Sequence, residues 1–367
     1  MKLRELRNQL NELPKGIEDG LSAKFYLEAL KNSFIGKVKT FINDPEGKKE
    51  FNHFEGIKDK TDTGISKFLG DLTDIIDDFN KKCLKCLQPD SVSNDFDVFK
   101  ALFFNGTDIR KDRKIFLENI KKDTDFYRIR GTGDKNKYEL FDHKGMYMMG
   151  PEHSARVGTA RFNLSGYACL YLAESLYLAW EECRRPDFHT ANFVRFCNCK
   201  ELTVFNLVIP DESKLRSSAA FFRTYLSLAC SVKAKDEEKD HWQYRISNLF
   251  IRMIYQVEGK KIDGIKYISS KRFENENFRI EYAKDCAAYV FPPKDIDGKH
   301  CKKLASMFEM TEAYSYFYFK IYGRNFISPK KAATREYDKT IFYFLETQLK
   351  EEKTIPCKEI IDDKITP

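Results

Sequence analysis

The sequence lacks any apolar run near the roughly 18 residues that a membrane-spanning helix needs. Its first residues, MKLRELRNQLNEL, are charged throughout, whereas a secretory signal peptide has an apolar core of about 7 to 15 residues. Neither a spanning segment nor a secretion signal is therefore expected. We predict a cytoplasmic protein that does not enter a membrane.

Metal-binding patterns are also scarce, although the chain has ten cysteines. Cys83 and Cys86 form one CxxC pair, and Cys197 and Cys199 form one CxC pair. A structural zinc site needs four ligands, and no second CxxC or HxxxH accompanies either pair. We therefore expect no metal, and we expect reduced, mostly buried thiols with Cys83 and Cys86 in a helical core.

No strong excess of one charge marks the chain. Its net charge of +7 is the small difference between 63 basic and 56 acidic residues, which are spread along the whole length. This excess suits an anionic ligand but does not argue for nucleic acid. A GxGxxG sequence after a strand is also absent, which excludes a dinucleotide held as a hydride carrier in a Rossmann cleft.

What is present begins with helical patterns over the first hundred residues. Apolar residues recur at helical spacing over 3–13, 21–42 and 65–79, the last stripe being the clearest. We predict a helical N-terminal region over 1–112. It serves either as a partner-binding or autoinhibitory module or, the favoured interpretation, as a cap over apolar surface of the following domain.

The remaining chain alternates strand and helix patterns. Strands are predicted at 125–130, 167–172, 202–209 and 262–270, and helices at 175–185, 217–230, 242–255 and 340–353. This mixture predicts an α+β protein with a twisted, mostly antiparallel sheet surrounded by helices. We divide it into a central domain at 113–297 and a C-terminal extension at 298–367.

The stretch from Gly158 to Cys183, GTARFNLSGYACLYLAESLYLAWEEC, combines a loop, a turn at Ser165-Gly166, a strand and a helix. It would hold three polar groups on one rigid unit: Arg161, Tyr171 and Glu182. Fixed placement of this kind is what a functional site needs.

Four blocks of the central domain resemble RES-domain proteins. They are FYR at 126–128, RFN…G…LYLAES…EE at 161–182, DGIKYISSKR at 263–272 and AYVFP at 288–292. The resemblance implies a fold similar to ADP-ribosyltransferases and an activity that breaks down NAD, in a family whose members are often toxins of bacterial toxin–antitoxin pairs. It also implies site roles for Arg128, which alone would suit a solvated edge strand, and for Ser269.

Two positions depart from the family pattern. The family usually has proline where Ile268 stands, and asparagine just before the closing strand, where Cys286 and Ala287 stand. These departures bear on the loop geometry of Ser269.

The chemistry of these side chains fits NAD as a substrate rather than a cofactor. A carboxylate at Glu182 could stabilise the cationic sugar that forms when the nicotinamide–ribose bond breaks. Guanidinium groups at Arg161 and Arg128 suit phosphate oxygens, and the Tyr171 ring suits a flat cationic heterocycle. Ser269 could hydrogen-bond the nicotinamide amide or a ribose hydroxyl.

The resemblance selects Glu182 over Glu181, because Glu182 has the family's spacing from Arg161 and Tyr171. Helical periodicity alone leaves both residues open, and paired glutamates on a helix usually lie on a solvated face.

Alternative functions are ADP-ribosyl transfer to a macromolecule and a binding module without catalysis. A HEPN-type ribonuclease is a further alternative, from the R-x4-H spacing of Arg184 and His189, but Pro186 would break the helix it needs. An antitoxin or regulatory protein and a second copy of the chain are candidate partners.

Overall fold

The computed structural model describes residues 1–13, 22–55, 57, 59–88, 91, 93–104, 116–132, 141–147, 157–158, 160–232, 242–256, 262–271, 277–279, 286–293, 301–316, 318–319 and 336–361. The chain divides into two compact units. Unit 1 comprises Met1–Glu118 and Phe205–Gln256, and unit 2 comprises Asn119–Val204 and Val257–Pro367. Of the predicted domain boundaries, 112/113 and 297/298 lie outside the described residues.

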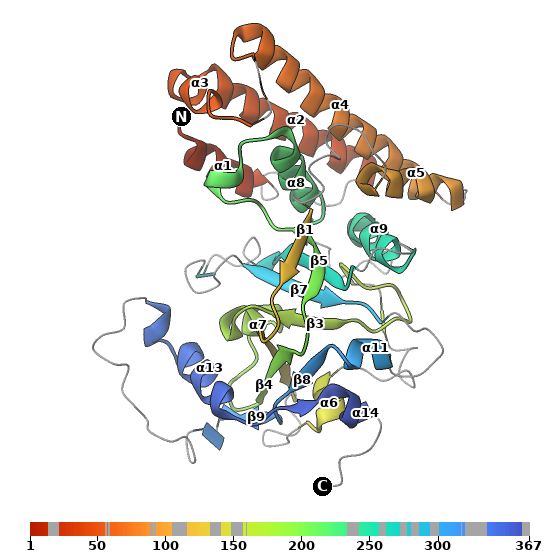
Figure 1. Ribbon diagram of the computed structural model, residues 1–367, viewed down its shortest axis with the longest axis vertical. Coiled ribbons are helices and arrows are strands. Elements are labelled where there is room, and N and C mark those ends of the chain that lie inside the picture. Colours follow the sequence, from red (N-terminus) through yellow and green to blue (C-terminus); the bar gives the residue numbers. More distant parts are fainter. Residues whose placement is uncertain are drawn as a thin grey trace. The chain divides into compact units, whose positions relative to one another are not determined.

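Unit 1 is helical (Figure 1). Its helices are α1 (Leu3–Asn11), α2 (Ala23–Asn43), α3 (Pro45–Phe51), α4 (Asp62–Cys86), α5 (Ser93–Phe104), α8 (Ser218–Ala229) and α9 (Trp242–Gln256), with a short 3-10 turn at Glu212–Lys214. The predicted stripe on α4 is confirmed, since Ile65, Phe68, Leu72 and Ile76 are buried. Side chains three and four residues apart share one face of a helix, so this stripe supplies the surface on which α2 and α8 pack.

Helix α8 packs inside this unit through buried contacts with the first helices of the chain. The Tyr225 hydroxyl donates to the Asn80 Oδ1 at 2.9 Å and to the Leu27 carbonyl at 3.1 Å. The rings of Phe79 and Phe222 meet edge to face at 5.9 Å, an arrangement that aromatic pairs favour. Unit 1 thus joins residues from two separate parts of the chain, whereas the sequence prediction used three consecutive segments.

One sheet runs through the described strands in the order β1-β5-β6-β7-β3-β2-β4-β8-β10, and β9 pairs with β4. The strands are β1 (Leu117–Ile120), β2 (Asp125–Gly131), β3 (Leu170–Ala173), β4 (Ala191–Asn198), β5 (Leu202–Leu207), β6 (Gly264–Ile268), β7 (Ala287–Phe291), β8 (Phe308–Met310), β9 (Tyr314–Ser315) and β10 (Ile355–Pro356). In this spatial order, each neighbouring pair from β6–β7 to β8–β10 is antiparallel, and so is the β4–β9 pair. The predicted α+β class is therefore confirmed.

Helices of unit 2 gather in two groups beside the sheet (Figure 1). They are α6 (His143–Tyr147), α7 (Leu176–Glu182), α11 (Lys302–Ala305), α13 (Ile341–Glu351) and α14 (Cys357–Ile361), with a 3-10 turn at Tyr337–Lys339. Helices α7 and α13 pack on each other and on β2 and β4, while α14 packs on α6, α11 and β8. The C-terminal residues therefore complete this unit by adding strands to its sheet and a helix beside α7.

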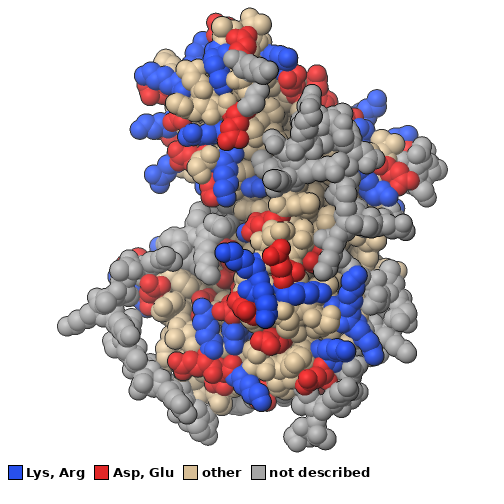
Figure 2. Space-filling model, viewed as in Figure 1, with Lys and Arg blue, Asp and Glu red and all other residues tan. Residues whose placement is uncertain are grey.

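Several local predictions are confirmed with small shifts at their ends. The predicted helices at 175–185, 217–230, 242–255 and 340–353 correspond to α7, α8, α9 and α13. All ten cysteines are free thiols, and Cys83 and Cys86 are buried. No helix within the described residues combines the length and apolar character needed to cross a membrane. On the face drawn in Figure 2, basic and acidic side chains intermingle.

Candidate active site

A cavity of about 200 Å³ in unit 2 lies where β2, β3, β6 and β7 meet the end of α7. Its lining includes Arg128 from β2, Tyr171 from β3, Glu182 and Cys183 from the end of α7, and Tyr267 from β6. Three of the five predicted site residues, Arg128, Tyr171 and Glu182, therefore line one cavity. Arg161 and Ser269 are not among its lining residues.

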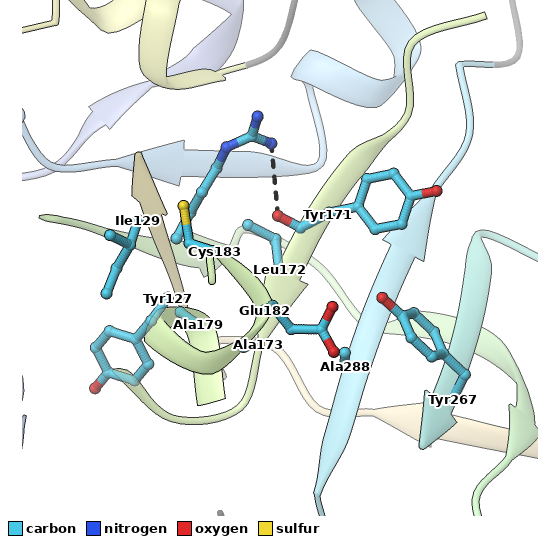
Figure 3. A pocket seen from close by; sticks show the side chains of 11 residues that line it. Tyr127, Ile129, Tyr171, Leu172, Ala173, Ala179, Glu182, Cys183, Tyr267 and Ala288 are labelled. Carbon is cyan, nitrogen blue, oxygen red and sulfur yellow. Dashed lines mark hydrogen bonds between the residues drawn. The ribbon is translucent and has the colours of Figure 1, made fainter. Parts of the chain in front are cut away.

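Glu182 is the last residue of a short helix whose start is fixed by a side-chain cap. The Ser175 hydroxyl accepts a hydrogen bond from the Leu178 amide at 3.2 Å, as N-cap serines do. At the other end, Oε1 of Glu182 is buried and has no hydrogen-bond partner among the described residues. In Figure 3 the Glu182 carboxylate and the Tyr267 hydroxyl point toward each other. A buried acceptor without a donor is costly to keep and suits a ligand that supplies one.

Glu181 has a different environment, although it is the neighbouring residue on the same helix. It is 2% exposed and accepts hydrogen bonds from Arg185 Nε at 2.9 Å and Nη2 at 2.8 Å. Arg184 and Arg185 both have positive φ, of 61° and 54°, which turns Arg185 back over α7 with its guanidinium 5.2 Å from the Trp180 ring. Glu181 is therefore committed to an ion pair, and neither glutamate belongs to a solvated face.

Arg128 brings a positive charge into the same cavity. Its Nη1 donates to the Tyr171 carbonyl at 3.5 Å, and within the described part of the chain no carboxylate forms an ion pair with it. Burial, followed by the nearby Arg130, lowers the pKa of the Arg128 guanidinium to about 10, because a low-dielectric environment disfavours the charged form. Arg128 thus differs from an edge-strand arginine in solvent, and its charge is available to an anion.

Two tyrosines form aromatic walls around Glu182. Burial, then the neighbouring Cys169 and Tyr267, raises the pKa of Tyr171 well above its usual value. The Phe162 backbone lowers the pKa of Tyr171. Its contact with the Tyr171 hydroxyl does not have the geometry of a hydrogen bond, and this hydroxyl has no hydrogen-bond partner within the described residues. Burial and the Glu182 carboxylate raise the pKa of Tyr267, and Arg161 lowers it. Both hydroxyls therefore stay protonated at neutral pH and can donate.

Sequence reasoning missed Tyr267, although a signal for it was present. Side chains two apart on a strand share a face, so the position of Ser269 implied that Tyr267 faces the same way. The ring of Phe162 packs on Tyr267 with centroids 4.6 Å apart. Residue 162 belongs to the RFN block, so this contact ties two of the matched blocks together.

Arg161 stands at a tight turn beside the cavity. Ala160 and Asn163 exchange backbone hydrogen bonds of 3.2 Å across it. The buried Asn163 amide holds this loop by donating to the Gly158 and Leu164 carbonyls and accepting from the Cys169 amide. The predicted turn at Ser165-Gly166 is confirmed, and Gly166 supplies its positive φ of 84°. Arg161 is half-buried and lies within electrostatic range of Tyr267.

Ser269 follows β6 and is fully buried. Its hydroxyl accepts a hydrogen bond from the Lys271 amide at 3.2 Å, and its own amide donates to the Cys286 carbonyl at 3.0 Å. Cys286 has a positive φ of 56°, a conformation in which asparagine is much commoner than most residues.

The R-x4-H pattern does not lie on a helix. Helix α7 ends at Glu182, ahead of both residues, and Arg184 and His189 are exposed. The pattern therefore lacks the helix that the ribonuclease motif needs, and α7 ends before Pro186 is reached. Within the residues the structure describes, no group of three or more His, Cys, Asp or Glu side chains is arranged to hold a metal ion.

Comparison with known proteins gives two matches. Residues 125–298 match the family model described as RES domain. A protein of Bacillus subtilis (strain 168), whose name reads "Putative toxin YopC", is 26% identical over 247 residues, which is 62% of this chain and 54% of that protein. The chain thus spans about half the length of this curated relative. No solved structure matches, so the likeness to ADP-ribosyltransferases stays a prediction.

Proposed function

The chain carries a RES domain over residues 125–298, and from this premise we propose that it degrades NAD by cleaving the bond between nicotinamide and ribose. The proposal assigns the reaction to the cavity between β2, β3, β6, β7 and α7. NAD is its substrate, and none of the proposed steps requires a cofactor or a metal.

The observation that carries the proposal is a pair of opposite charges that share one cavity without neutralising each other. Arg128 and Glu182 both line it, yet among the described residues neither forms an ion pair with the other or with a third group. Both side chains are half-buried, and charges withdrawn from water are normally paired. A ligand that has both a cationic centre and anionic groups would satisfy the two together, and NAD has a pyridinium ring and two phosphates.

The reaction follows from the charge that develops as the bond breaks. The electron pair of the C1′–N1 bond moves to the nicotinamide nitrogen, which neutralises the ring and leaves an oxocarbenium ion on the ribose. The Glu182 carboxylate stabilises this cation. With water as acceptor, the oxygen bonds to C1′ and one proton is released, so that NAD⁺ and water give ADP-ribose, nicotinamide and H⁺.

The size of the cavity supports enclosure of one end of the substrate. Sites that enclose a whole drug-sized ligand have volumes of roughly 300 Å³ or more, and this cavity has about 200 Å³. We place the nicotinamide ring and its ribose inside, against Tyr171 and Tyr267. The pyrophosphate then extends toward Arg128 and the half-buried Arg161, whose guanidinium groups bind phosphate oxygens in pairs. Ser269 contributes indirectly, through the turn that follows β6.

A toxin or defence role follows as part of the same proposal, since the Bacillus subtilis relative carries the word toxin in its name. Depletion of NAD would harm the cell that makes such an enzyme, so an antitoxin that binds this chain is the expected partner. Transfer of ADP-ribose to a macromolecule would use the same bond cleavage with a different acceptor. A binding module would retain the cavity without turnover.

Incubating the purified chain with NAD, and separately with RNA, distinguishes these functions. We expect release of nicotinamide and ADP-ribose, with RNA left intact. Labelled ADP-ribose on added cell protein would indicate transfer to a macromolecule, and phosphate added to the buffer would reveal a phosphorolytic acceptor as ADP-ribose 1″-phosphate. NAD that binds but persists unchanged would reject the proposed activity and leave the binding module.

A further inference from the structure

A buried carboxylate from the C-terminal helix lies at the beginning of α7. Glu346 of α13 is 5% exposed, and its Oε1 accepts a hydrogen bond from the Leu176 amide at 2.6 Å. The Tyr337 hydroxyl donates to the same oxygen. Leu176 is the first residue of α7, and Glu182 is the last. Glu346 itself lies beyond residue 298, where the RES match ends.

The first turn of a helix has amides without intrahelical partners and a partial positive charge. Two buried side chains satisfy these amides in α7, the Ser175 hydroxyl at Leu178 and the Glu346 carboxylate at Leu176. Burial and the adjacent Glu346 raise the pKa of Tyr337, which keeps its hydroxyl protonated as a donor. The start of α7 is thus held by one neutral cap and one charge-assisted hydrogen bond, and bonds of the second kind are the stronger.

Helix α13 is itself fixed to β4 and, through Arg195, to β2, which lines the cavity. Arg195 of β4 donates to the Leu349 carbonyl at 2.9 Å and to the Glu352 carbonyl at 3.2 Å, at the end of α13. The same guanidinium pairs with Asp125 of β2 at 2.9 Å. Strand β2 carries Arg128 three residues further on, so α13 connects the strand of Arg128 with the helix of Glu182.

Aromatic packing reinforces this connection along α7. The ring of Phe342 on α13 lies 5.2 Å from that of Tyr177 and 5.4 Å from that of Trp180. Close-packed side chains of this kind transmit displacement instead of absorbing it. The two helices therefore have both a polar and an apolar contact.

We propose that Glu346 is a positioning residue that sets where the Glu182 carboxylate enters the cavity; its effect on turnover rests on the function proposed above. Helix α7 has seven residues and a length of about 10 Å at 1.5 Å per residue. Two turns of helix move as one body, so release of the Leu176 amide displaces Glu182 as well. A misplacement of about 1 Å can cost a reaction on the order of a hundredfold.

The competing explanation is that Glu346 only caps a helix. A cap contributes to the stability of the fold, and its loss lowers the melting temperature without a selective effect on the cavity. The two explanations differ in the turnover number and in the protection of amides at the far end of α7.

The test compares Glu346→Ala, Glu346→Gln and a matched control, Glu351→Ala, in the full chain. Glu351 is an exposed glutamate of the same helix. Glu346→Ala is expected to lower the kcat for NAD by about 10- to 100-fold with KM within a few-fold. Glu346→Gln should recover most of this loss, because its amide oxygen still accepts from Leu176 and Tyr337. Glu351→Ala should match the parent protein.

Hydrogen exchange measures the same effect without reference to activity. Glu346→Ala should accelerate exchange of the α7 amides through Glu182 by at least tenfold over the parent and over Glu351→Ala. Unchanged exchange at the end of α7, or a parent-like kcat with only a lower melting temperature, would overturn the proposal. A parent protein inert toward NAD would reject the proposed function alone, because the exchange result still decides the positioning role.

If Glu346→Ala does not fold, Tyr337→Phe removes the Tyr337 hydrogen bond to the carboxylate, keeps that of Leu176, and serves as the milder variant. It should give a smaller fall in kcat and a smaller rise in exchange at Glu182. Parent-like values of both would overturn the proposal in the same way.

Discussion

Adjacent glutamates on α7 should respond oppositely to removal of their charge. In Glu181→Gln the substitution breaks an ion pair in which the Glu181 side chain is 1% exposed and that of Arg185 is 32% exposed. Breaking a fully buried pair costs about 3 to 5 kcal/mol, and breaking an exposed pair costs at most about 1 kcal/mol. Because Arg185 can turn partly into solvent, we expect an intermediate loss of about 2 kcal/mol.

Glu182→Gln removes the charge of a group whose buried Oε1 has no hydrogen-bond partner in the described residues. Its unfolding free energy should therefore stay within about 0.5 kcal/mol of the parent or rise, since no hydrogen bond or ion pair between described residues is lost. At about 2 to 4 °C per kcal/mol for domains of this size, Glu181→Gln should melt about 4 to 8 °C below the parent, while Glu182→Gln should not.

Thermal unfolding followed by circular dichroism measures both variants, with Arg185→Ala as the matched partner of Glu181→Gln. The double variant should lose less than the sum of the two single losses, because the pair can be broken only once. Equal melting temperatures for Glu181→Gln and the parent, or a loss as large in Glu182→Gln, would refute the division of roles between these residues.

Three further predictions concern the cavity and the helical unit. Arg161→Ala should strongly weaken NAD binding measured by calorimetry. Arg161→Lys should recover only part of the affinity, because an ammonium group does not form the two parallel hydrogen bonds that a guanidinium makes with a phosphate. NAD affinities equal to that of the parent in both variants would remove Arg161 from the phosphate role. The folded-state pKa of Arg128 is lowered to about 10, so its charge opposes folding at every pH below that value. Arg128→Met should accordingly raise the unfolding free energy by about 1 kcal/mol or more at pH 7 while weakening NAD binding, and a less stable variant would contradict this. Deleting residues 1–112 should give an aggregating chain, because α8 would lose its packing against α2 and α4; a monodisperse, active product in light scattering would show a separable module.

Local pattern predicted most elements of both units. The spacing of apolar residues located α4, α8, α9 and α13, and strand patterns located β2, β3 and β6, which line the cavity. Helix α7 begins after Ser175 as predicted and ends at Glu182, before Pro186 is reached. Residue types alone did not separate Glu181 from Glu182, because both suit the same face pattern. The difference arises from two consecutive residues of positive φ, Arg184 and Arg185, and no sequence rule predicts such a conformation for arginine.

Contacts between distant parts of the chain were beyond the reach of sequence patterns. The packing of α8 against α2 and α4 depends on Tyr225 reaching Leu27 and Asn80, which are separated from it by more than a hundred residues. Glu346 is one glutamate in an amphipathic helix, and its carboxylate gains meaning only from the Leu176 amide. Periodicity reports which face of an element is buried, and it does not report which partner covers that face.

NAD turnover by Glu182→Gln is the most direct test of the account. This change keeps the size of the side chain and removes the charge that would stabilise the ribosyl cation. Nicotinamide release should fall by a factor on the order of a hundred or more, while NAD affinity stays within a few-fold of the parent and the melting temperature does not fall. Nicotinamide release at the parent rate would contradict the role of Glu182, and the match of residues 125–298 to the RES domain would then indicate similarity without the proposed chemistry.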